Sequence, residues 1–365
     1  HRDLHSFPTR RSSDLVEATT DCLSALTEAR VSSLKLASTT LPFLDRQNSV
    51  VIAEALSLDR TISTMDCSAS QRAATSALIN CLESNRNGNQ LLVASEHRRT
   101  KAGSRAEMLW GDAAAAVAIG DDDVIAQCLG VATHAVDFID HYRGDGADFD
   151  YDWEERWIRD EGFMKIVPTV VESVLDDAGV AAADIKHFIL PTDQARTPAA
   201  LAKRLGINAE AIVDNQIASV GVAGAAQPLL LLAKALESAT AGDTILLLGF
   251  GQGCDAILLR ATDKLAQCKP RLGLSSALMR RREETNYNKF LSFNNLVERD
   301  IGKRGEADKQ TYLSGYNRRK DLLTSFLGGK CRECGTVQIP REKYCVNPEC
   351  NALDSQDVYS FASQQ

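Results

Sequence analysis

Four cysteines near the end of the chain are spaced as ligands of one metal ion. Cys331 and Cys334 are separated by two residues, and ten residues later come Cys345 and Cys350, four residues apart. Two pairs of thiolates around short turns are typical of a tetrahedral structural zinc site. Because no histidine or open ligand position is implied, we expect a closed site that binds Zn²⁺ for structure and not for catalysis.

A second stretch, residues 61–84, has the pattern of a strand that turns sharply into a buried helix. A β-branched run ends at Asp66, and from Ser70 small and then apolar residues follow at helical spacing. The free N–H groups and the dipole at such a helix N-terminus favour an anion or a thiolate. Enzymes place nucleophiles at such turns, and the thiol of Cys67 lies beside this one.

This stretch resembles the nucleophile elbow of the thiolase superfamily, especially β-ketoacyl-acyl-carrier-protein synthase III and hydroxymethylglutaryl-CoA synthase. Their pattern is Asp, four mostly small residues, the catalytic Cys, Ala-Gly, and later Ala-Leu on the same helix. Asp66 and Ala77-Leu78 fit this pattern without a gap, which places the catalytic position on Gln71 and leaves Cys67 at the strand end four residues earlier. An amide cannot attack a thioester, so the resemblance implies a site without the usual nucleophile.

The other two catalytic positions of the family also differ. The synthases' Pro-His-Gln-Ala motif matches residues 191–195 with one residue inserted, so that Asp193 takes the place of the His. Their Gly-Asn-Thr turn matches residues 220–222, which places Gly221 at the Asn position and implies that Gly221 contributes to substrate binding. Their Gly-Phe-Gly-x-Gly turn, whose N–H groups help form an oxyanion hole, matches Gly249–Gly253, and we expect Gly251 and Gly253 to bind substrate.

Alternatives remain open for the polar residues. Gln71 and Arg72 are candidates to hydrogen-bond a thioester carbonyl or a carboxylate, and a packing role for Gln71 is the alternative. Asp193 is a candidate general base if it is desolvated, and the alternative is a helix cap or an ion pair with Arg196. His134 and His141 are candidates for acid–base work or for structural roles.

Two cysteines need separate treatment. Cys67 is a candidate displaced nucleophile, but the charge of Asp66 raises a thiol pKa, and a buried cysteine is usually a small hydrophobic residue. The same alternatives hold for Cys254, beside the glycine-rich turn.

Alternating strand and helix patterns predict an α/β fold. We expect helices at residues 16–29, 50–58, 70–84, 164–177, 198–205 and 219–236, and strands at 31–38, 61–66, 90–95, 113–120, 124–138, 185–190, 244–248 and 256–260. With the resemblance, this order implies a thiolase-like duplicated α-β-α-β-α layered fold followed by a small zinc-ribbon domain. The insertion at residues 137–161 and the aromatic run at 148–163 are expected to wall an acyl tunnel, form a dimer rim or face solvent.

We divide the chain into five segments. Residues 1–15 resemble a translated sequencing adapter and are expected to be non-native; residues 16–123 form a first thiolase-like half whose start is expected to be missing; residues 124–265 form the second half; residues 266–328 are a linker with helices; and residues 329–365 are a zinc ribbon with the start of a truncated OB-fold. The last two segments resemble an acyl-CoA-associated module, which implies a thiolase or hydratase partner.

Composition narrows the function classes. The net charge of −8 and pI near 5.4 argue against nucleic acid as a partner. No apolar run reaches the length of a membrane span, and ten cysteines, six scattered and four clustered, fit a reducing, cytoplasmic location.

The resemblance implies a homodimer that handles an acyl-CoA or acyl-carrier-protein thioester. Three functions remain open. The first is an enzyme that forms no acyl-cysteine, such as a carbon–carbon lyase or aldolase. The second is a catalytically silent acyl-CoA-binding or scaffolding protein, and the third is an acyltransferase that uses Cys67.

Overall fold

The computed structural model describes residues 9–24, 26, 30–84, 88–268, 272–298, 300 and 312–362, with side chains from residue 14 onward. The first half comprises α1 (Thr9–Leu23), β1 (Val31–Ala37), α2 (Asn48–Ala55), β2 (Ser63–Cys67), α3 (Ala73–Leu82), β3 (Asn89–Glu96), α4 (Arg105–Leu109) and β4 (Ala113–Ile119). The second half comprises β5 (Ala126–Ala135), β6 (His141–Tyr142), β7 (Tyr151–Asp152), α5 (Glu155–Trp157), the π-helix η1 (Ile158–Phe163), α6 (Met164–Ala178), β8 (Ile185–Ile189), α7 (Thr197–Leu205), α8 (Gln227–Leu236), β9 (Thr244–Phe250) and β10 (Gly253–Ala261).

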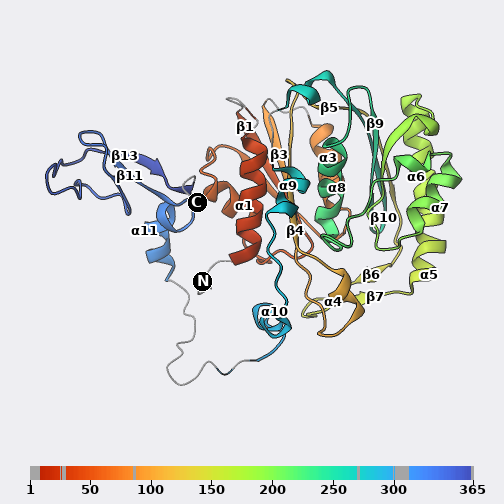
Figure 1. The fold of residues 1–365 in the computed structure, drawn as a ribbon, viewed down its shortest axis with the longest axis horizontal. Helices are drawn as coiled ribbons and strands as arrows, with labels where there is room; N and C mark the ends of the chain where they lie inside the picture. Colours follow the sequence, from red (N-terminus) through yellow and green to blue (C-terminus); the bar gives the residue numbers. More distant parts are fainter. Residues whose placement is uncertain are drawn as a thin grey trace.

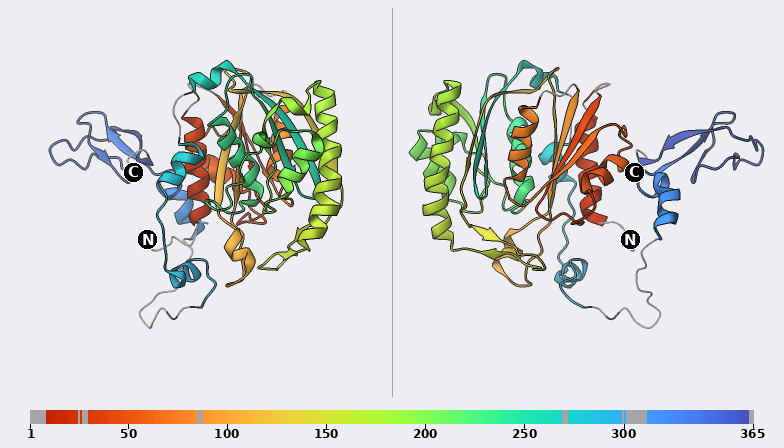
Figure 2. Two further views of the ribbon diagram at one scale, coloured as in Figure 1. Left: turned by 45° about the vertical axis from the view of Figure 1, so that its right-hand side comes forward. Right: turned by 180° about the vertical axis from the view of Figure 1, so that it is seen from behind.

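These two halves form the layers α-β-α-β-α (Figure 1). One sheet has the order β2-β1-β3-β4 and the other the order β5-β10-β9-β8. Helices α3 and α8 lie between the sheets, α1 and α2 cover the outer face of the first sheet, and α6 and α7 cover the outer face of the second (Figures 1 and 2). Amphipathic helices on both faces of a largely buried sheet are the usual solution for an α/β chain.

The two halves repeat one another. In each half a helix precedes the first strand of the repeat: α1 precedes β1, and α6 precedes β8. That strand pairs in parallel with a later strand, β1 with β3 and β8 with β9. An antiparallel strand then follows, β4 beside β3 and β10 beside β9. The central helices α3 and α8 precede β3 and β9, respectively. The structure therefore bears out the duplicated layered fold expected from the sequence.

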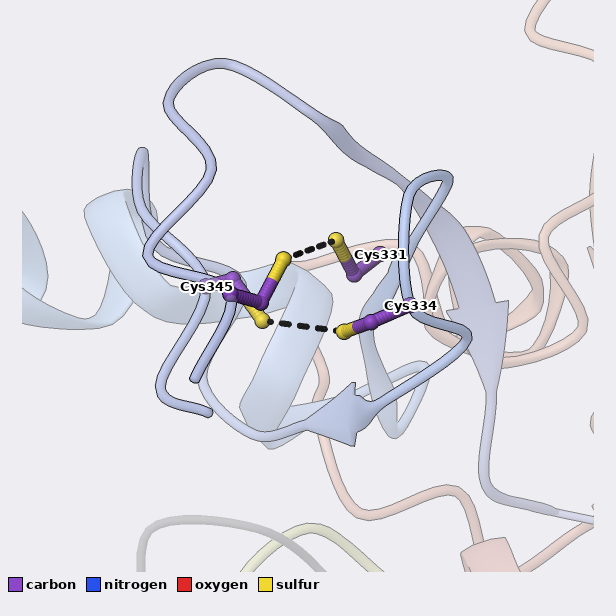
Figure 3. A group of neighbouring side chains, drawn as sticks. Cys331, Cys334 and Cys345 are labelled. Carbon is purple, nitrogen blue, oxygen red and sulfur yellow. Dashed lines mark hydrogen bonds between the residues drawn. The ribbon is translucent and has the colours of Figure 1, made fainter. Parts of the chain in front are cut away.

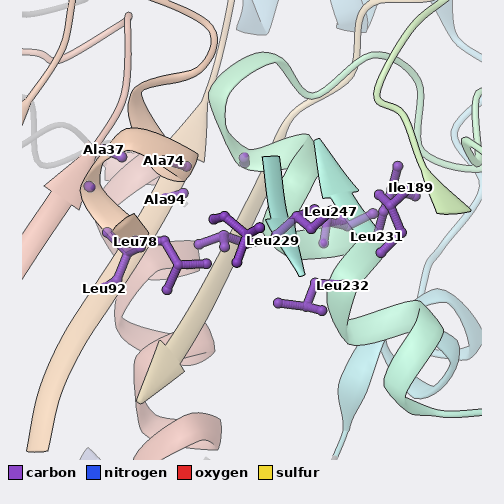
Figure 4. Packing of buried hydrophobic residues seen from close by; sticks show 14 of the residues in the cluster. Ala37, Ala74, Leu78, Leu92, Ala94, Ile189, Leu229, Leu231, Leu232 and Leu247 are labelled. Carbon is purple, nitrogen blue, oxygen red and sulfur yellow. The ribbon is translucent and has the colours of Figure 1, made fainter. Parts of the chain in front are cut away.

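The core between the sheets is built from small and aliphatic residues. Leu78 of α3 lies toward Leu229 of α8, whereas Leu231 lies on the other side of α8 beside Ile189 and Leu247 (Figure 4). Small residues on α3 allow the central helices to approach both sheets closely. This packing fixes the start of α3, where the candidate site lies.

One edge of the first sheet is open. Strand β10 pairs with β5 on its outer side, whereas β4 has a described partner on one side, β3, and every residue of β4 is half-buried. A cavity of about 2280 Å³ is lined by β4 and by parts of α1, α8 and α9 (Gly273–Met279). A second cavity, of about 20 Å³, lies near Phe43, and neither cavity is lined by Gln71 or Asp193.

Some element boundaries differ from the sequence prediction. Helix α1 starts at Thr9, inside the segment expected to be non-native, and Leu15 is buried in the core under the first sheet. The expected linker from residue 266 contains α9, whose Leu274 packs into the central core, so this part belongs to the layered body. Tertiary packing extends these elements beyond their sequence signals.

A separate small sheet ends the described chain. After α10 (Tyr287–Phe293) and α11 (Leu313–Leu323) come β11 (Leu327–Cys331), β12 (Val337–Gln338) and β13 (Gln356–Ser360), in the sheet order β12-β11-β13. Helix α11 contacts α2 through Lys320, whose ammonium is 2.9 Å from the Glu54 carboxylate, and Ser325 donates a hydrogen bond to the Glu54 carbonyl at 2.6 Å. Among the described residues, no helix is long and apolar enough to cross a membrane.

Candidate functional site

The predicted strand–turn–helix elbow is present at the end of β2. Ala69 has a positive φ of 74°, a conformation that is uncommon for a residue with a side chain, and α3 begins at Ala73. Ser70 donates a hydrogen bond to the Gly251 carbonyl at 2.9 Å, which ties the turn to the second half. The elbow therefore holds Gln71 immediately before α3, where the two halves meet.

Asp66 supports this turn from the opposite side. Its carboxylate accepts hydrogen bonds from the backbone N–H groups of Asn48 and Ser49, at 2.7 and 2.8 Å, at the first turn of α2. Burial opposes its ionisation, but these hydrogen bonds outweigh that effect and hold the pKa of Asp66 below its usual value. Asp66, which fits the family pattern, thus caps the N-terminus of α2, the helix before the elbow.

Gln71 points at a histidine from the insertion. Its Nε2 lies 3.1 Å from Nε2 and 3.5 Å from Nδ1 of the His141 ring, and Nδ1 of His141 lies 3.0 Å from Oδ1 of Asp140. The His141 and Asp140 side chains are 13% and 12% exposed, so this row of three polar groups is largely shielded from water. His141 is brought to the elbow by the β6–β7 hairpin, in which it pairs with Asp152.

Arg72 is occupied by a buried carboxylate. Its guanidinium is 2.7 Å from Asp255 of β10, which is 1% exposed, and Asp255 also accepts hydrogen bonds from Thr75, Ser76 and Thr133 at 2.9, 2.6 and 2.7 Å. These contacts fasten the start of α3 to the second sheet. The substrate-binding role predicted for Arg72 is untested, and the geometry gives it a structural one.

The glycine-rich turn lies against the elbow, as the sequence predicts. A Cβ at Gly251 would lie 2.7 Å from Ser70 Oγ and 3.3 Å from the Gln71 nitrogen. The Gly251 N–H donates to the Gly253 carbonyl at 3.0 Å, so in this conformation it is used within the turn. The role of Gly251 and Gly253 in an oxyanion hole therefore stays a prediction. For Gly251 to fill this role, its N–H would have to leave the Gly253 carbonyl.

Gly221 lies in a different contact. Its φ is +87°, and a Cβ there would be 2.8 Å from the Gly111 nitrogen. The neighbouring Val222 accepts a hydrogen bond from the Gly111 N–H at 3.1 Å and donates one to the Leu109 carbonyl at 2.7 Å. The structure thus explains the glycine at this position by close backbone approach, and its predicted role in substrate binding is untested.

Asp193 lies in the loop between β8 and α7. Its side chain is 38% exposed and its nearest cation is Arg105, at 4.0 Å, instead of the expected Arg196. Partial desolvation raises the pKa of Asp193, Arg105 opposes that rise, and the negative charges of Glu155 and Asp152 add to it. Since Asp152 pairs with His141, this hairpin joins the surroundings of Asp193 to those of Gln71.

Cys67 and Cys254 have the environments of structural cysteines. Burial raises the pKa of the Cys67 thiol, and the neighbouring Cys81 and Asp66 raise it further against the opposing charge of Lys35. Cys254 is fully buried, and burial raises its pKa strongly. A raised pKa leaves little thiolate at neutral pH, which disfavours either cysteine as nucleophile.

His134 is exposed on β5, where it pairs in register with Cys254. In the aromatic run, Tyr151 and Trp153 are 54% and 46% exposed and contact one another at 6.4 Å between ring centroids. These rings therefore face outward from the hairpin.

The four cysteines of the terminal sheet converge as expected. The Sγ atoms of Cys331, Cys334, Cys345 and Cys350 all lie within 4.8 Å of one another (Figure 3). The Cys331–Cys350 and Cys334–Cys345 distances are 3.8 and 3.5 Å, close to the roughly 3.8 Å separation of thiolates at about 2.3 Å from a tetrahedral Zn²⁺. The residues fit a metal ion, and the identity of that metal is untested.

Sequence reasoning missed two aspartates. Asp140 directly precedes His141, and Asp255 is the one buried charge in the apolar strand β10, whose other charged residue, Arg260, is exposed. A charge within a buried strand signals a buried partner, although the sequence does not reveal which partner.

Parts of the sequence match known proteins. Residues 175–260 match the family described as 3-oxoacyl-[acyl-carrier-protein] synthase III C terminal. Hydroxymethylglutaryl-CoA synthase of Caldivirga maquilingensis is 24% identical over 258 residues, covering 68% of this chain and 74% of the relative.

Solved structures show the same fold. FabH, the 3-oxoacyl-(acyl carrier protein) synthase III of Pseudomonas aeruginosa, has a TM-score of 0.61 at 24% identity, covering 69% of this chain and 83% of that one. MvaS in complex with 3-hydroxy-3-methylglutaryl coenzyme A has a TM-score of 0.65 at 16% identity, covering 81% and 82%. The chain thus has the fold of the synthase III and hydroxymethylglutaryl-CoA synthase structures.

Proposed function

We propose that this protein binds an acyl thioester of coenzyme A or acyl-carrier protein at the elbow and acts on it without forming an acyl-cysteine. A carbon–carbon lyase or aldolase reaction fits this description best. The observation that carries the proposal is Gln71 at the nucleophile position, with its amide directed into the site toward His141 at 3.1 Å.

An amide at this position can stabilise charge even though it cannot attack carbon. Its N–H group can donate a hydrogen bond to the thioester oxygen, where negative charge develops as a bond to the neighbouring carbon breaks. Fixed donors in a site shielded from water stabilise such an oxyanion without reorganisation. Similarity to MvaS, solved with a coenzyme A thioester, supports this ligand class.

A catalytically silent acyl-CoA-binding or scaffolding protein is the second candidate. It is favoured by the hydrogen bond that already occupies the Gln71 amide and by the placement of both cavities away from Gln71. An acyltransferase that uses Cys67 is the third candidate, and the raised pKa of that thiol weighs against it.

The terminal sheet belongs to the same proposal as a structural module. We infer that its four thiolates bind one Zn²⁺ as a zinc ribbon and that the module contacts a thiolase or hydratase partner. We also propose that the protein is a homodimer, that it is located in the cytoplasm, and that it does not bind nucleic acid.

Saturated, 3-hydroxy and 3-keto acyl-CoAs, incubated separately with the protein and analysed for small-molecule products, test this function. Cleavage of a 3-hydroxyacyl-CoA into a shorter acyl-CoA and a carbonyl compound is the expected result. Binding of these acyl-CoAs without any turnover would favour the silent protein, and absence of binding would contradict both.

A further inference from the structure

We propose that the open edge of β4 accepts a fifth strand of the first sheet, which runs antiparallel to β4 and is supplied by polypeptide that leads into α1. This surface lies on the first half of the molecule, and its role is independent of the acyl thioester proposed for the elbow. The proposal rests on the internal repeat of the fold, on the bare edge of β4 and on the groove beside that edge.

The two halves correspond element by element except at this edge. Helices α1, α2 and α3 correspond to α6, α7 and α8, and strands β1, β3 and β4 correspond to β8, β9 and β10. Strand β2, which pairs in parallel with β1, corresponds to the parallel bridge between Phe188 and Ile212. In the second half, β5 precedes α6 and pairs antiparallel with β10 along its outer edge. Among the described residues, the first half has no counterpart of β5.

Strand β4 lacks the features that usually protect a free sheet edge. Residues 113–119 have the sequence AAAAVAI, without a charge or a proline, although exposed edge strands commonly carry lysine, proline or a bulge. Every residue of β4 is half-buried, whereas every residue of β10 except Arg260 is buried. Because β4 is antiparallel to β3, alternate residues of β4 direct their N–H and C=O groups away from β3. Those groups face no other strand in the described part of the chain.

The groove beside this edge runs the full length of β4. All of residues 113–119 line the cavity of about 2280 Å³, together with parts of α1, α8 and α9. Both faces of β4 already belong to apolar clusters: Ala115 and Val117 pack toward the central core, and Ala114 and Ala116 pack toward the core under α1. A strand in this groove continues both layers, so its side chains must be apolar on both faces.

Strand β5 shows such a pattern at the corresponding place. Its Cys128 and Val131 pack toward the central core, and its Leu129 and Ala132 pack toward the core under α6. Helix α6 contacts both β5 and β10, whereas α1 contacts β4 and β3. A strand beside β4 would therefore extend the first sheet in the way that β5 extends the second.

The repeat also indicates the source of the strand. Because β5 lies ahead of α6 in the chain, its counterpart belongs ahead of α1. Residues 1–8 include Arg2, Asp3 and Pro8 and lack a two-faced apolar pattern, so the strand belongs to polypeptide ahead of them. A second copy of this chain fits less well, since its own α1 and α9 would meet these groove walls as its β4 approached.

Hydrogen exchange of the unaltered protein, followed by mass spectrometry, tests the edge first. We expect the amides of β4 to exchange faster than those of β10, whose outer edge is covered by β5. Equal protection of the two strands would show that the edge of β4 is already paired, and it would overturn the proposal.

The probe for strand addition is a synthetic peptide with the sequence of residues 124–136, carrying Cys128→Ser to prevent oxidation. The matched control peptide has N-methyl groups on alternate residues, so it keeps every side chain but cannot complete the ladder. At ten times its Kd, the probe is expected to slow exchange in β4 about tenfold and to leave β10 unchanged. Absence of probe binding, or equal protection by both peptides, would overturn strand addition.

A third experiment tests the source of the strand. The probe sequence replaces residues 1–8 and is joined to Thr9 through a glycine–serine linker. We expect β4 in this chain to be protected at every protein concentration. An unprotected β4 here, despite binding of the free probe, would overturn the assigned source, as would protection that rises with the concentration of the unaltered protein. None of these readouts uses acyl-CoA, so their outcome is separate from that of the proposed function.

Discussion

Asp255 shows how a single buried charge positions the elbow. Its two carboxylate oxygens receive the Arg72 guanidinium and the hydroxyls of Thr75, Ser76 and Thr133. All of these donors belong to α3, its N-terminal turn or β5, so the carboxylate joins the two halves of the molecule beside Gln71. A buried ion pair stabilises little in total, but removing one partner leaves the other uncompensated.

Asp255→Asn is therefore expected to lower the free energy of unfolding by about 3 kcal/mol, because Arg72 loses its buried counter-ion. Chemical denaturation measures this change. The matched control is Asp148→Asn, which removes the partner of Arg99 in an exposed pair and is expected to cost at most about 1 kcal/mol. Equal small effects from both substitutions would contradict the assigned role of Asp255.

Asp66 contributes a pH-dependent part of the stability. Burial opposes its charge, but hydrogen bonds from Ser49 and Asn48 hold its folded-state pKa below the unfolded value of about 3.9. The stabilisation is thus present above that pH and is lost as pH falls through the lower, folded-state pKa.

Asp66→Asn is expected to cost about 1 to 2 kcal/mol at pH 7, the range for loss of a helix N-terminal cap, and the difference from the unaltered protein should shrink in acid. Denaturation curves between pH 2.5 and 7 measure it. A difference that stays constant over this range would show that ionisation of Asp66 does not stabilise the fold.

At the scale of elements, the site depends on two turns that must touch. The turn between β9 and β10 uses Gly251 and Gly253 at φ of +154° and +117°, and a Cβ at Gly253 would lie 2.0 Å from the His134 carbonyl oxygen. Since the obstacle is backbone, no side-chain rotation can relieve it. The close approach of β5 and β10 therefore requires glycine here.

Gly253→Ala is expected to lower the free energy of unfolding by about 3 kcal/mol, in the range of strain and overpacking effects. The control is Gly144→Ala, where a Cβ would meet nothing within 4 Å and the φ is not positive. We expect the control to unfold within about 0.5 kcal/mol of the unaltered protein. Thermal denaturation of the two variants distinguishes a local steric requirement from a general cost of losing glycine.

The sequence predicts the elements of the site better than their contacts. The strand before Gln71, the glycine turn and the cysteine pairs follow from local patterns, because residue spacing dictates each of them. The pairing of Gln71 with His141 joins segments 70 residues apart, and it depends on how the insertion folds back. For the same reason, the segment predicted from residue 266 as a linker with helices gives no sign that Leu274 of α9 is buried in the central core.

At the scale of the whole molecule, the layered body and the terminal cysteine module are stabilised in different ways. The body has three packed apolar clusters, one between the sheets and one under each outer layer. The terminal sheet has short strands around four cysteines, and small domains of this kind usually depend on their metal.

Removing the metal with a chelator is expected to unfold the terminal module while the unfolding transition of the layered body stays within about 2 °C. Metal analysis should give one zinc per chain, and Cys345→Ser should reproduce the effect of the chelator. Cys128→Ser is the control, because Cys128 lies on β5, away from the cysteine cluster. Unchanged protease resistance of the terminal module after full metal removal would contradict a structural metal site.

Intact-protein mass spectrometry after incubation with acyl-CoAs tests the central claim most directly. The account predicts that the protein binds the thioester and that its mass does not change, because we assign Gln71 to the position of the nucleophile and because burial raises the pKa of Cys67. A stable acyl adduct that maps to Cys67, and that disappears in Cys67→Ala, would contradict the account and establish covalent acyl transfer.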